Sequence, residues 1–146
     1  MWLRGGSEFP AGEFASATRP SRGKTLVATV LVVDDDRVIS TLVVGLLRAK
    51  GHKTLTAFDA VQALMQAKRT PLVDAIVLDV NMPGGSGEEI LRKLKTMSNT
   101  SNIPVIILSG SIDANGQERV RGLGAAAVLS KPLVPEELFQ ALASAL

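Results

Sequence analysis

The chain has 146 residues, of which 46% are hydrophobic and only 3% aromatic, and its formal net charge at pH 7 is +2. This length allows one domain with a substantial core and excludes two domains of ordinary size. The absence of cysteine excludes disulfides and thiolate metal sites, and the longest apolar run, residues 26–33, is too short to span a bilayer, so we expect a cytoplasmic protein without a membrane segment.

The first 25 residues differ from the rest and are predicted to form a flexible tail. They are rich in Gly, Ser, Ala and Pro, show no hydrophobic period, and contain GSEF, letters that resemble a translated cloning site. The domain itself is therefore expected to occupy residues 26–146.

From residue 27 onward, short β-branched runs alternate with amphipathic segments. In chain order we predict strand 27–33, helix 37–50, strand 53–57, helix 60–68, strand 73–79, helix 88–97, strand 104–109, helix 114–121, strand 126–130 and a last helix that opens at Pro135. This order implies right-handed crossovers and a parallel sheet covered by helices on both faces.

Cap residues and apolar stripes mark the helices. Asp36 and Asp59 stand at the N-caps of the first two helices, Gly51 follows the end of the first, and Gly116 weakens the fourth. The stripes expected to face the core are Val38, Leu42, Gly45 and Leu46 in the first helix, Ile90, Leu91, Leu94 and Met97 in the third, and Leu138 and Leu142 in the last. His52, the single histidine, is expected to be solvated.

The basic residues are scattered and do not form a stripe interleaved with aromatic residues. Arg92, Lys93 and Lys95 are expected on one solvated helix face. Because nucleic-acid binding usually needs a concentrated basic surface, we expect no nucleic-acid binding by this domain.

Polar residues stand where four of the five predicted strands end. The residues are Asp34, Asp35 and Asp36 after the first strand, Asp79 at the end of the third, Ser109 at the end of the fourth and Lys131 after the fifth. In an α/β sheet of strand order 2-1-3-4-5 these ends meet at one edge, where ligands bind. Any one of them alone is more simply a cap, a turn residue or a surface lysine.

The conjunction of these side chains is harder to explain without a ligand. Carboxylates held within a few ångströms raise the pKa of one another unless a cation neutralises them. Hard oxygen ligands of this kind suit Mg²⁺, which pairs one or two carboxylates with a phosphate oxygen. The sequence therefore predicts a magnesium site at this edge of the sheet.

Four motifs occur in order: VLVVDDD at the first strand, IVLDVNMPGGSG at the third, VIILSG at the fourth and VLSKP at the fifth. Together they resemble the receiver domain of bacterial two-component response regulators, and the likeness covers residues 26–146. The resemblance implies a flavodoxin-like (βα)₅ three-layer sandwich with a five-stranded parallel sheet in the order 2-1-3-4-5. It also implies a signalling domain, not an enzyme, that assists its own phosphorylation and dephosphorylation.

The resemblance assigns the phosphoacceptor and the metal ligands. Asp79 would take a phosphoryl group from a histidine kinase, a histidine phosphotransfer protein or a small phosphodonor. Asp35 would coordinate Mg²⁺ directly together with Asp79, Asp34 would act largely through water, and the backbone carbonyl of Asn81 would complete the protein ligands.

The resemblance also implies how the signal leaves the site. Ser109 would hydrogen-bond one phosphoryl oxygen, and Lys131, expected to precede a cis peptide bond to Pro132, would pair with another. Movement of Ser109 would then switch a surface formed by the fourth helix, fifth strand and fifth helix, which binds a downstream partner or output domain. The family commonly has an aromatic residue three positions before the lysine, and this chain departs from that pattern with Val128.

Two other functions compete with the receiver. Residues 34–38 satisfy the D-x-D-x-[TV] pattern of haloacid-dehalogenase-like phosphohydrolases, with Asp34 as nucleophile, but that function leaves Asp79 without a role. The chain also lacks the acidic pair that those hydrolases have after the lysine, unless Glu136 and Glu137 are that pair. The other alternative is a catalytically silent α/β interaction module, that is, one that catalyses no reaction. Such a module would bind no Mg²⁺. Within the receiver hypothesis, a stand-alone protein and a piece of a larger regulator or hybrid kinase both remain open.

Overall fold

The computed structural model describes residues 27–69, 72–82 and 87–146, so the predicted tail and part of the loop after the third strand lie outside the described residues. The strands are β1 Thr29–Val33, β2 Lys53–Ala57, β3 Ala75–Asp79, β4 Val105–Ser109 and β5 Ala127–Ser130. The helices are α1 Arg37–Ala49, α2 Ala60–Ala67, α3 Gly87–Thr96, α4 Ala114–Gly122 and α5 Pro135–Ala145. The predicted alternation of strands and helices is confirmed, with ends that differ by one or two residues.

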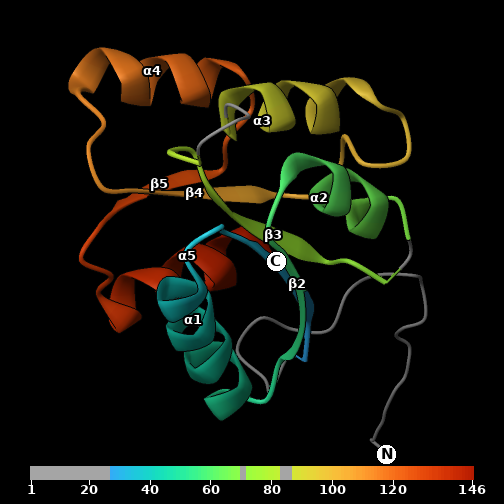
Figure 1. Cartoon of the computed structure of the whole chain (residues 1–146), viewed down its shortest axis with the longest axis vertical. Coiled ribbons are helices and arrows are strands. Elements are labelled where there is room, and N and C mark those ends of the chain that lie inside the picture. Colours follow the sequence, from blue (N-terminus) through green and yellow to red (C-terminus); the bar gives the residue numbers. More distant parts are fainter. Residues whose placement is uncertain (1–26, 70–71, 83–86) are drawn as a thin grey trace, which may run out of the picture.

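The five strands form one parallel sheet in the order β2-β1-β3-β4-β5, which confirms the predicted topology. Helices α1 and α5 lie on one face of the sheet, and α2, α3 and α4 lie on the other (Figure 1). The register pairs Val33 with Leu78 and Asp79 with Leu108. The carboxyl ends of β1, β3 and β4 are therefore level with one another.

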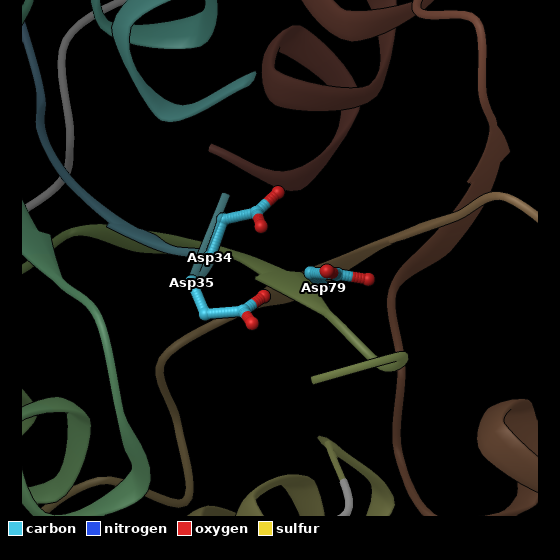
Figure 2. Close-up of side chains that lie close together, drawn as sticks. All are labelled: Asp34, Asp35 and Asp79. Carbon is cyan, nitrogen blue, oxygen red and sulfur yellow. The ribbon is translucent and has the colours of Figure 1, made fainter. Parts of the chain in front are cut away.

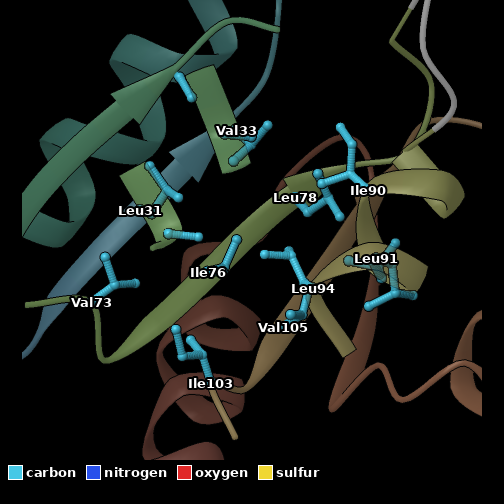
Figure 3. Packing of buried hydrophobic residues seen from close by; sticks show 14 of the residues in the cluster. Leu31, Val33, Val73, Ile76, Leu78, Ile90, Leu91, Leu94, Ile103 and Val105 are labelled. Carbon is cyan, nitrogen blue, oxygen red and sulfur yellow. The ribbon is translucent and has the colours of Figure 1, made fainter. Parts of the chain in front are cut away.

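Two hydrophobic cores separate the layers. Side chains alternate along each strand, so Leu31 and Ile76 contribute to the core under α2, α3 and α4 (Figure 3). Val30 and Val32 contribute to the core under α1 and α5. Every residue of β3 and β4 is buried. Central parallel strands covered on both faces require continuous apolar runs of this kind.

Helix α1 buries a different stripe from the predicted one. Ser40, Val43 and Leu47 face the core, whereas Val38 is 77% exposed and Leu42 is 48% exposed. The helix sequence RVISTLVVGLLRA places apolar residues around much of its circumference, so its period alone does not identify one buried face. The chain path from β1 selects the stripe that contains Ser40. The predicted stripes of α3 and α5 are confirmed.

Two predictions of solvated side chains are wrong. Nδ1 of His52 accepts a hydrogen bond from the backbone N–H of Ala28 at 3.1 Å, and burial lowers the pKa of this imidazole. Nζ of Lys95 donates to the carbonyls of Ser101 at 3.1 Å and Ile103 at 2.7 Å. His52 binds a backbone group that precedes β1, and Lys95 binds carbonyls in the segment that follows α3; a local sequence pattern does not contain either contact.

The helix ends follow the predicted caps. Asp36 accepts hydrogen bonds from the first turn of α1, Asp59 accepts one from Gln62 N in α2, and Gly51 has φ +90° past the end of α1. Close packing explains the glycine at position 116 in α4, because a Cβ there would stand 2.6 Å from Cγ1 of Ile112. Among the helices of the described residues, none has the length and apolar content needed to cross a membrane.

Candidate functional site

Three carboxylates converge at the carboxyl edge of the sheet. Asp34 and Asp35 follow β1, Asp79 ends β3, and one carboxylate oxygen of each lies within 4.8 Å of the others (Figure 2). Asp34 and Asp79 meet because β1 and β3 are neighbours and both residues come directly after the paired residues Val33 and Leu78. The predicted grouping of these aspartates is therefore present in the structure.

The carboxylates differ in their surroundings. Asp34 is 2% exposed and Asp79 is 4% exposed, whereas Asp35 is exposed. Oδ1 of Asp34 accepts a hydrogen bond from Asp36 N at 2.9 Å, and Oδ1 of Asp79 accepts one from Asn81 N at 2.9 Å. Oδ2 of Asp34 is buried and accepts no hydrogen bond from any described residue. A buried oxygen of this kind normally needs a partner.

Lys131 reaches these two buried carboxylates from the end of β5. Its Nζ lies 3.4 Å from Oδ2 of Asp79 and 3.7 Å from Oδ2 of Asp34, and its side chain is 21% exposed. The backbone N–H of Lys131 donates to Ser109 O at 2.8 Å, which ties the lysine to the end of β4. The peptide bond between Lys131 and Pro132 is cis, as expected. Lys131 is thus part of the site and not a surface lysine.

The charges of the site are incompletely balanced. Burial raises the pKa of Asp34 from 3.8 to about 6; the nearby Asp79 carboxylate adds to this rise, while the Asp36 N–H and the Lys131 ammonium oppose it. One ammonium therefore faces two buried carboxylates, with Asp35 at the same edge. An orphaned carboxylate oxygen within an all-oxygen donor set fits a hard divalent cation such as Mg²⁺.

Ser109 and Asn81 form a second polar contact beside the carboxylates. Nδ2 of Asn81 donates to Oγ of Ser109 at 3.1 Å, and the same oxygen accepts a hydrogen bond from Ser111 N at 3.3 Å. Ser109 is 1% exposed. Only the backbone carbonyl of Asn81 was predicted to have a role, and the contact of its side chain with Ser109 was not predicted. The available signal was the position of Asn81, two residues past a strand that neighbours the strand of Ser109.

A hollow of about 520 Å³ opens next to this contact, between the β3–α3 and β4–α4 connections. Its lining includes Asn81, Ser111 and Ile112. Glu88 of α3 and Arg119 of α4 border it and form a two-fold contact, with N–O distances of 2.8 and 2.7 Å. The hollow thus lies beside the Asn81–Ser109 contact, on the side of α3 and α4.

Comparison with known proteins agrees with this geometry. Residues 30–143 match the response regulator receiver domain. The response regulator PleD of Caulobacter vibrioides is 40% identical over 114 residues, which cover 77% of this chain and 24% of that protein. The phosphate regulon transcriptional regulatory protein PhoB of Escherichia coli is 40% identical over 113 residues, which cover 75% of this chain and 47% of PhoB. The chain thus spans about a quarter and about half of the length of these relatives.

Solved structures show the same relationship. The chemotaxis protein CheY4 of Vibrio cholerae has a TM-score of 0.77 and 31% sequence identity, over 83% of this chain and 100% of that chain. A response regulator receiver domain protein from Clostridium thermocellum has a TM-score of 0.75 and 31% identity, over 82% of this chain and 94% of that chain. Since the family match covers most of the described residues, the chain belongs to the receiver domains of two-component response regulators.

Proposed function

We propose that Asp79 is the phosphoacceptor of this receiver domain and takes its phosphoryl group from the phosphohistidine of a histidine kinase or a histidine phosphotransfer protein. The observation that carries this proposal is that Asp79, at the end of β3, shares a cluster with Asp34 and Asp35 and has the ammonium of Lys131 3.4 Å from its Oδ2. Of the two buried carboxylates that Lys131 contacts, Asp79 is the nearer, at 3.4 Å against 3.7 Å for Asp34.

This chain supplies the nucleophile and a cation for the transfer, and the partner supplies the phosphohistidine. An oxygen of the Asp79 carboxylate attacks phosphorus, the phosphorus–nitrogen bond of the phosphohistidine breaks, and the imidazole leaves with the electron pair of that bond. The backbone N–H of Asn81 holds Oδ1 of Asp79, which orients the carboxylate. Lys131 pairs with a phosphoryl oxygen and offsets the charge that develops there.

Asp34, Asp35, Asp79 and the backbone carbonyl of Asn81 would hold Mg²⁺, with Asp34 acting largely through water. When bound, this ion supplies positive charge that stabilises the transferring phosphoryl group. The support for this ligand set is the cluster of carboxylate oxygens within 4.8 Å and the buried Oδ2 of Asp34.

The same groups would assist both gain and loss of the phosphoryl group. A small phosphodonor such as acetyl phosphate would serve because Asp79 and Lys131 belong to this chain and not to the kinase. In the reverse direction, water attacks phosphorus, the bond to Asp79 breaks, and inorganic phosphate leaves while the carboxylate is regenerated. The hollow beside Asn81 and Ser111 would be the route for that water.

Output would begin at Ser109. Its hydroxyl is held by Asn81 and Ser111 N in the resting site, and a phosphoryl oxygen on Asp79 would offer it a new acceptor. Movement of Ser109 would shift the start of α4 and the face formed by α4, β5 and α5, which would bind a downstream partner or output domain. Val128 is half-buried and packs against the core under α2, α3 and α4, so we infer that this switch operates without an aromatic rotamer.

The alternative functions have less support. A hydrolase that used Asp34 as nucleophile would leave Asp79, and its contact with Lys131 at 3.4 Å, without a role. The family match also disfavours this alternative. A silent interaction module would leave the acidic cluster without a ligand, and Mg²⁺ titration distinguishes it from the receiver.

Intact-mass spectrometry after incubation with acetyl phosphate tests the proposal, with and without Mg²⁺. We expect one Mg²⁺-dependent phosphoryl adduct on the wild type and none on Asp79→Asn. Asp36→Asn is the matched control, because it removes a neighbouring charge while asparagine still caps α1, and it should keep the adduct. An adduct that persists in Asp79→Asn, or that disappears in Asp34→Asn alone, would move the nucleophile elsewhere.

A further inference from the structure

A second concave surface lies at the outer edge of the sheet, away from the aspartates. A groove of about 740 Å³ is lined by the start of α1, the end of β2 and the outer side of α2. Strand β2 pairs with β1 on one side, and no strand of the described residues pairs with its other side. Figure 1 shows α1 and α2 on opposite sides of this edge strand. The groove therefore crosses the edge of the sheet.

One wall of the groove is a stripe of α2 that does not face the core. Ala63 and Ala67 are the buried residues of this helix, whereas Gln62, Met65 and Gln66 line the groove. Met65 is 65% exposed. Methionine is flexible and polarizable, and it is common on surfaces that bind varied apolar side chains. This wall thus offers an apolar contact flanked by two neutral amides.

The charges of the lining are all of one sign. Arg37, Lys68 and Arg69 contribute cations, and no carboxylate occurs among the described residues that line the groove. The acidic residues Asp36 and Asp59 are not part of the lining, and they accept backbone N–H groups at the starts of α1 and α2. The groove therefore has an unbalanced positive charge that favours an anionic occupant.

The cations stand at both ends of the groove. Arg37 lies over the ring of Phe58, 4.1 Å from its centroid, near the start of α2, and this stacking holds the guanidinium in place. Lys68 and Arg69 follow the last turn of α2. The eight residues of α2 span about 12 Å, which an extended chain covers with about four residues. Met65 of α2 lies between these ends, and the ring of Phe58 lies at the Arg37 end.

We propose that this groove binds a short, extended acidic segment of a partner protein, with acidic residues about four positions apart around one apolar side chain. The acidic residues pair with Arg37 at one end and with Lys68 and Arg69 at the other, and the apolar side chain contacts Phe58 and Met65. The edge of β2 that no described strand pairs with offers backbone groups to such a segment. A concave groove that crosses a strand edge fits a peptide better than a flat membrane surface. This binding does not depend on phosphorylation of Asp79.

The test uses the full chain and a phage library of random linear peptides. Enriched peptides are synthesised with a fluorophore, and their binding is measured by fluorescence anisotropy. We expect enrichment of sequences with acidic residues on both sides of an apolar one. The double variant Lys68→Glu, Arg69→Glu should weaken binding by at least about tenfold. Its matched control is Arg92→Glu, Lys93→Glu, which makes the same charge change on the exposed face of α3 and should leave binding within about twofold.

A second pair of variants tests the apolar contact. Met65→Ser should weaken binding by about threefold or more, whereas Val61→Ser, which changes another exposed side chain of α2 outside the groove, should not. Thermal melts establish that all variants fold. Asp79→Asn should bind the peptides like the wild type, so loss of the phosphoacceptor and loss of this groove give different results.

Several outcomes would overturn the proposal. Peptides enriched equally on the wild type and on the Lys68→Glu, Arg69→Glu variant would show that the groove selects nothing. Equal affinity of a peptide whose apolar residue is replaced by serine would indicate simple attraction of polyanions. Sedimentation that reveals a dimer lost only in the groove variants would assign the surface to a second copy of the chain.

Discussion

At the scale of single residues, Asp34 is a carboxylate that the fold holds at a cost in stability. Its folded-state pKa, about 6, lies above its usual value of 3.8, mainly because it is buried. A carboxyl group whose pKa is raised in the folded state binds its proton more tightly there than in the unfolded state. Its destabilising effect is therefore present above about pH 6 and is relieved as the pH falls from about 6 towards 3.8.

Asp34→Asn should stabilise the metal-free protein at pH 7.5, because it removes this buried charge. The rise of the pKa from 3.8 to about 6 corresponds to at most about 3 kcal/mol in the free energy of unfolding. Urea denaturation at pH 7.5 and pH 5 measures the effect, and the gain should shrink at the lower pH. Asp36→Asn is the control with no expected gain. A variant no more stable than the wild type at pH 7.5 would show that the carboxylate is not held at a cost.

Lys131 is the one cation within salt-bridge distance of these carboxylates among the described residues. Lys131→Met should therefore strengthen Mg²⁺ binding, by about threefold or more, since a competing positive charge 3.4 Å from Asp79 is removed. The same change should slow phosphorylation, because a phosphoryl oxygen loses its partner. Calorimetric Mg²⁺ titration measures the first effect and acetyl phosphate labelling the second. Lys93→Met on exposed α3 is the control, and unchanged values for Lys131→Met would remove this residue from the site.

At the scale of secondary-structure elements, the junction of β3 and α3 is packed too closely for a side chain. A Cβ on Gly87 would collide with Cα of Val80 and would stand 2.6 Å from the carbonyl oxygen of Asp79. These are backbone atoms next to the proposed phosphoacceptor, so they cannot move aside as a flexible side chain would. The start of α3 therefore helps to set the position of Asp79.

Gly87→Ala should destabilise the protein by about 1–3 kcal/mol and slow phosphorylation, because the new methyl group displaces the backbone of Asp79 and Val80. Gly45 offers a matched control within α1: a Cβ there would have nothing within 4 Å. Gly45→Ala should stabilise the protein by about 0.5–1 kcal/mol through higher helix propensity. Chemical denaturation of both variants measures the change in the free energy of unfolding, which should have opposite signs in the two. Equal changes would contradict the packing argument.

At the scale of the whole molecule, stability is unevenly distributed. All residues of β3 and β4 are buried, whereas α4 buries only Gly116 and Val120. Its exposed Arg119 pairs with Glu88 of α3, and pairs on an exposed surface contribute little. The proposed output surface is thus built on one of the least buried elements of the described fold.

Hydrogen exchange followed by mass spectrometry should detect this difference. We expect amides of α4 to exchange well before those of β3 and β4 in the unphosphorylated protein, because local opening of α4 exposes little apolar surface. Phosphorylation should change exchange mainly in α4, β5 and α5, while α1 serves as the internal control. Uniform exchange across these elements, or a change confined to α1, would contradict the proposed output surface.

The fold was predictable because its signals are local. Hydrophobic runs, Asp and Gly caps and Pro135 mark the elements, and the alternation of strands and helices restricts the topology. The convergence of Asp34, Asp35, Asp79 and Lys131 was also predictable, since each stands at the carboxyl end of a parallel strand. The buried face of α1 was not, because that helix has apolar residues on more than one side.

The sequence by itself determined the order of the elements and the edge of the sheet at which the aspartates and the lysine meet, since both follow from hydrophobic period and strand ends. The tertiary structure alone decided what each group contacts there. Oδ2 of Asp34 is left without a hydrogen bond, the Asn81 amide holds Ser109, and a basic groove forms beside β2. These features depend on neighbours that lie far apart in the sequence, and only the packed fold brings them together.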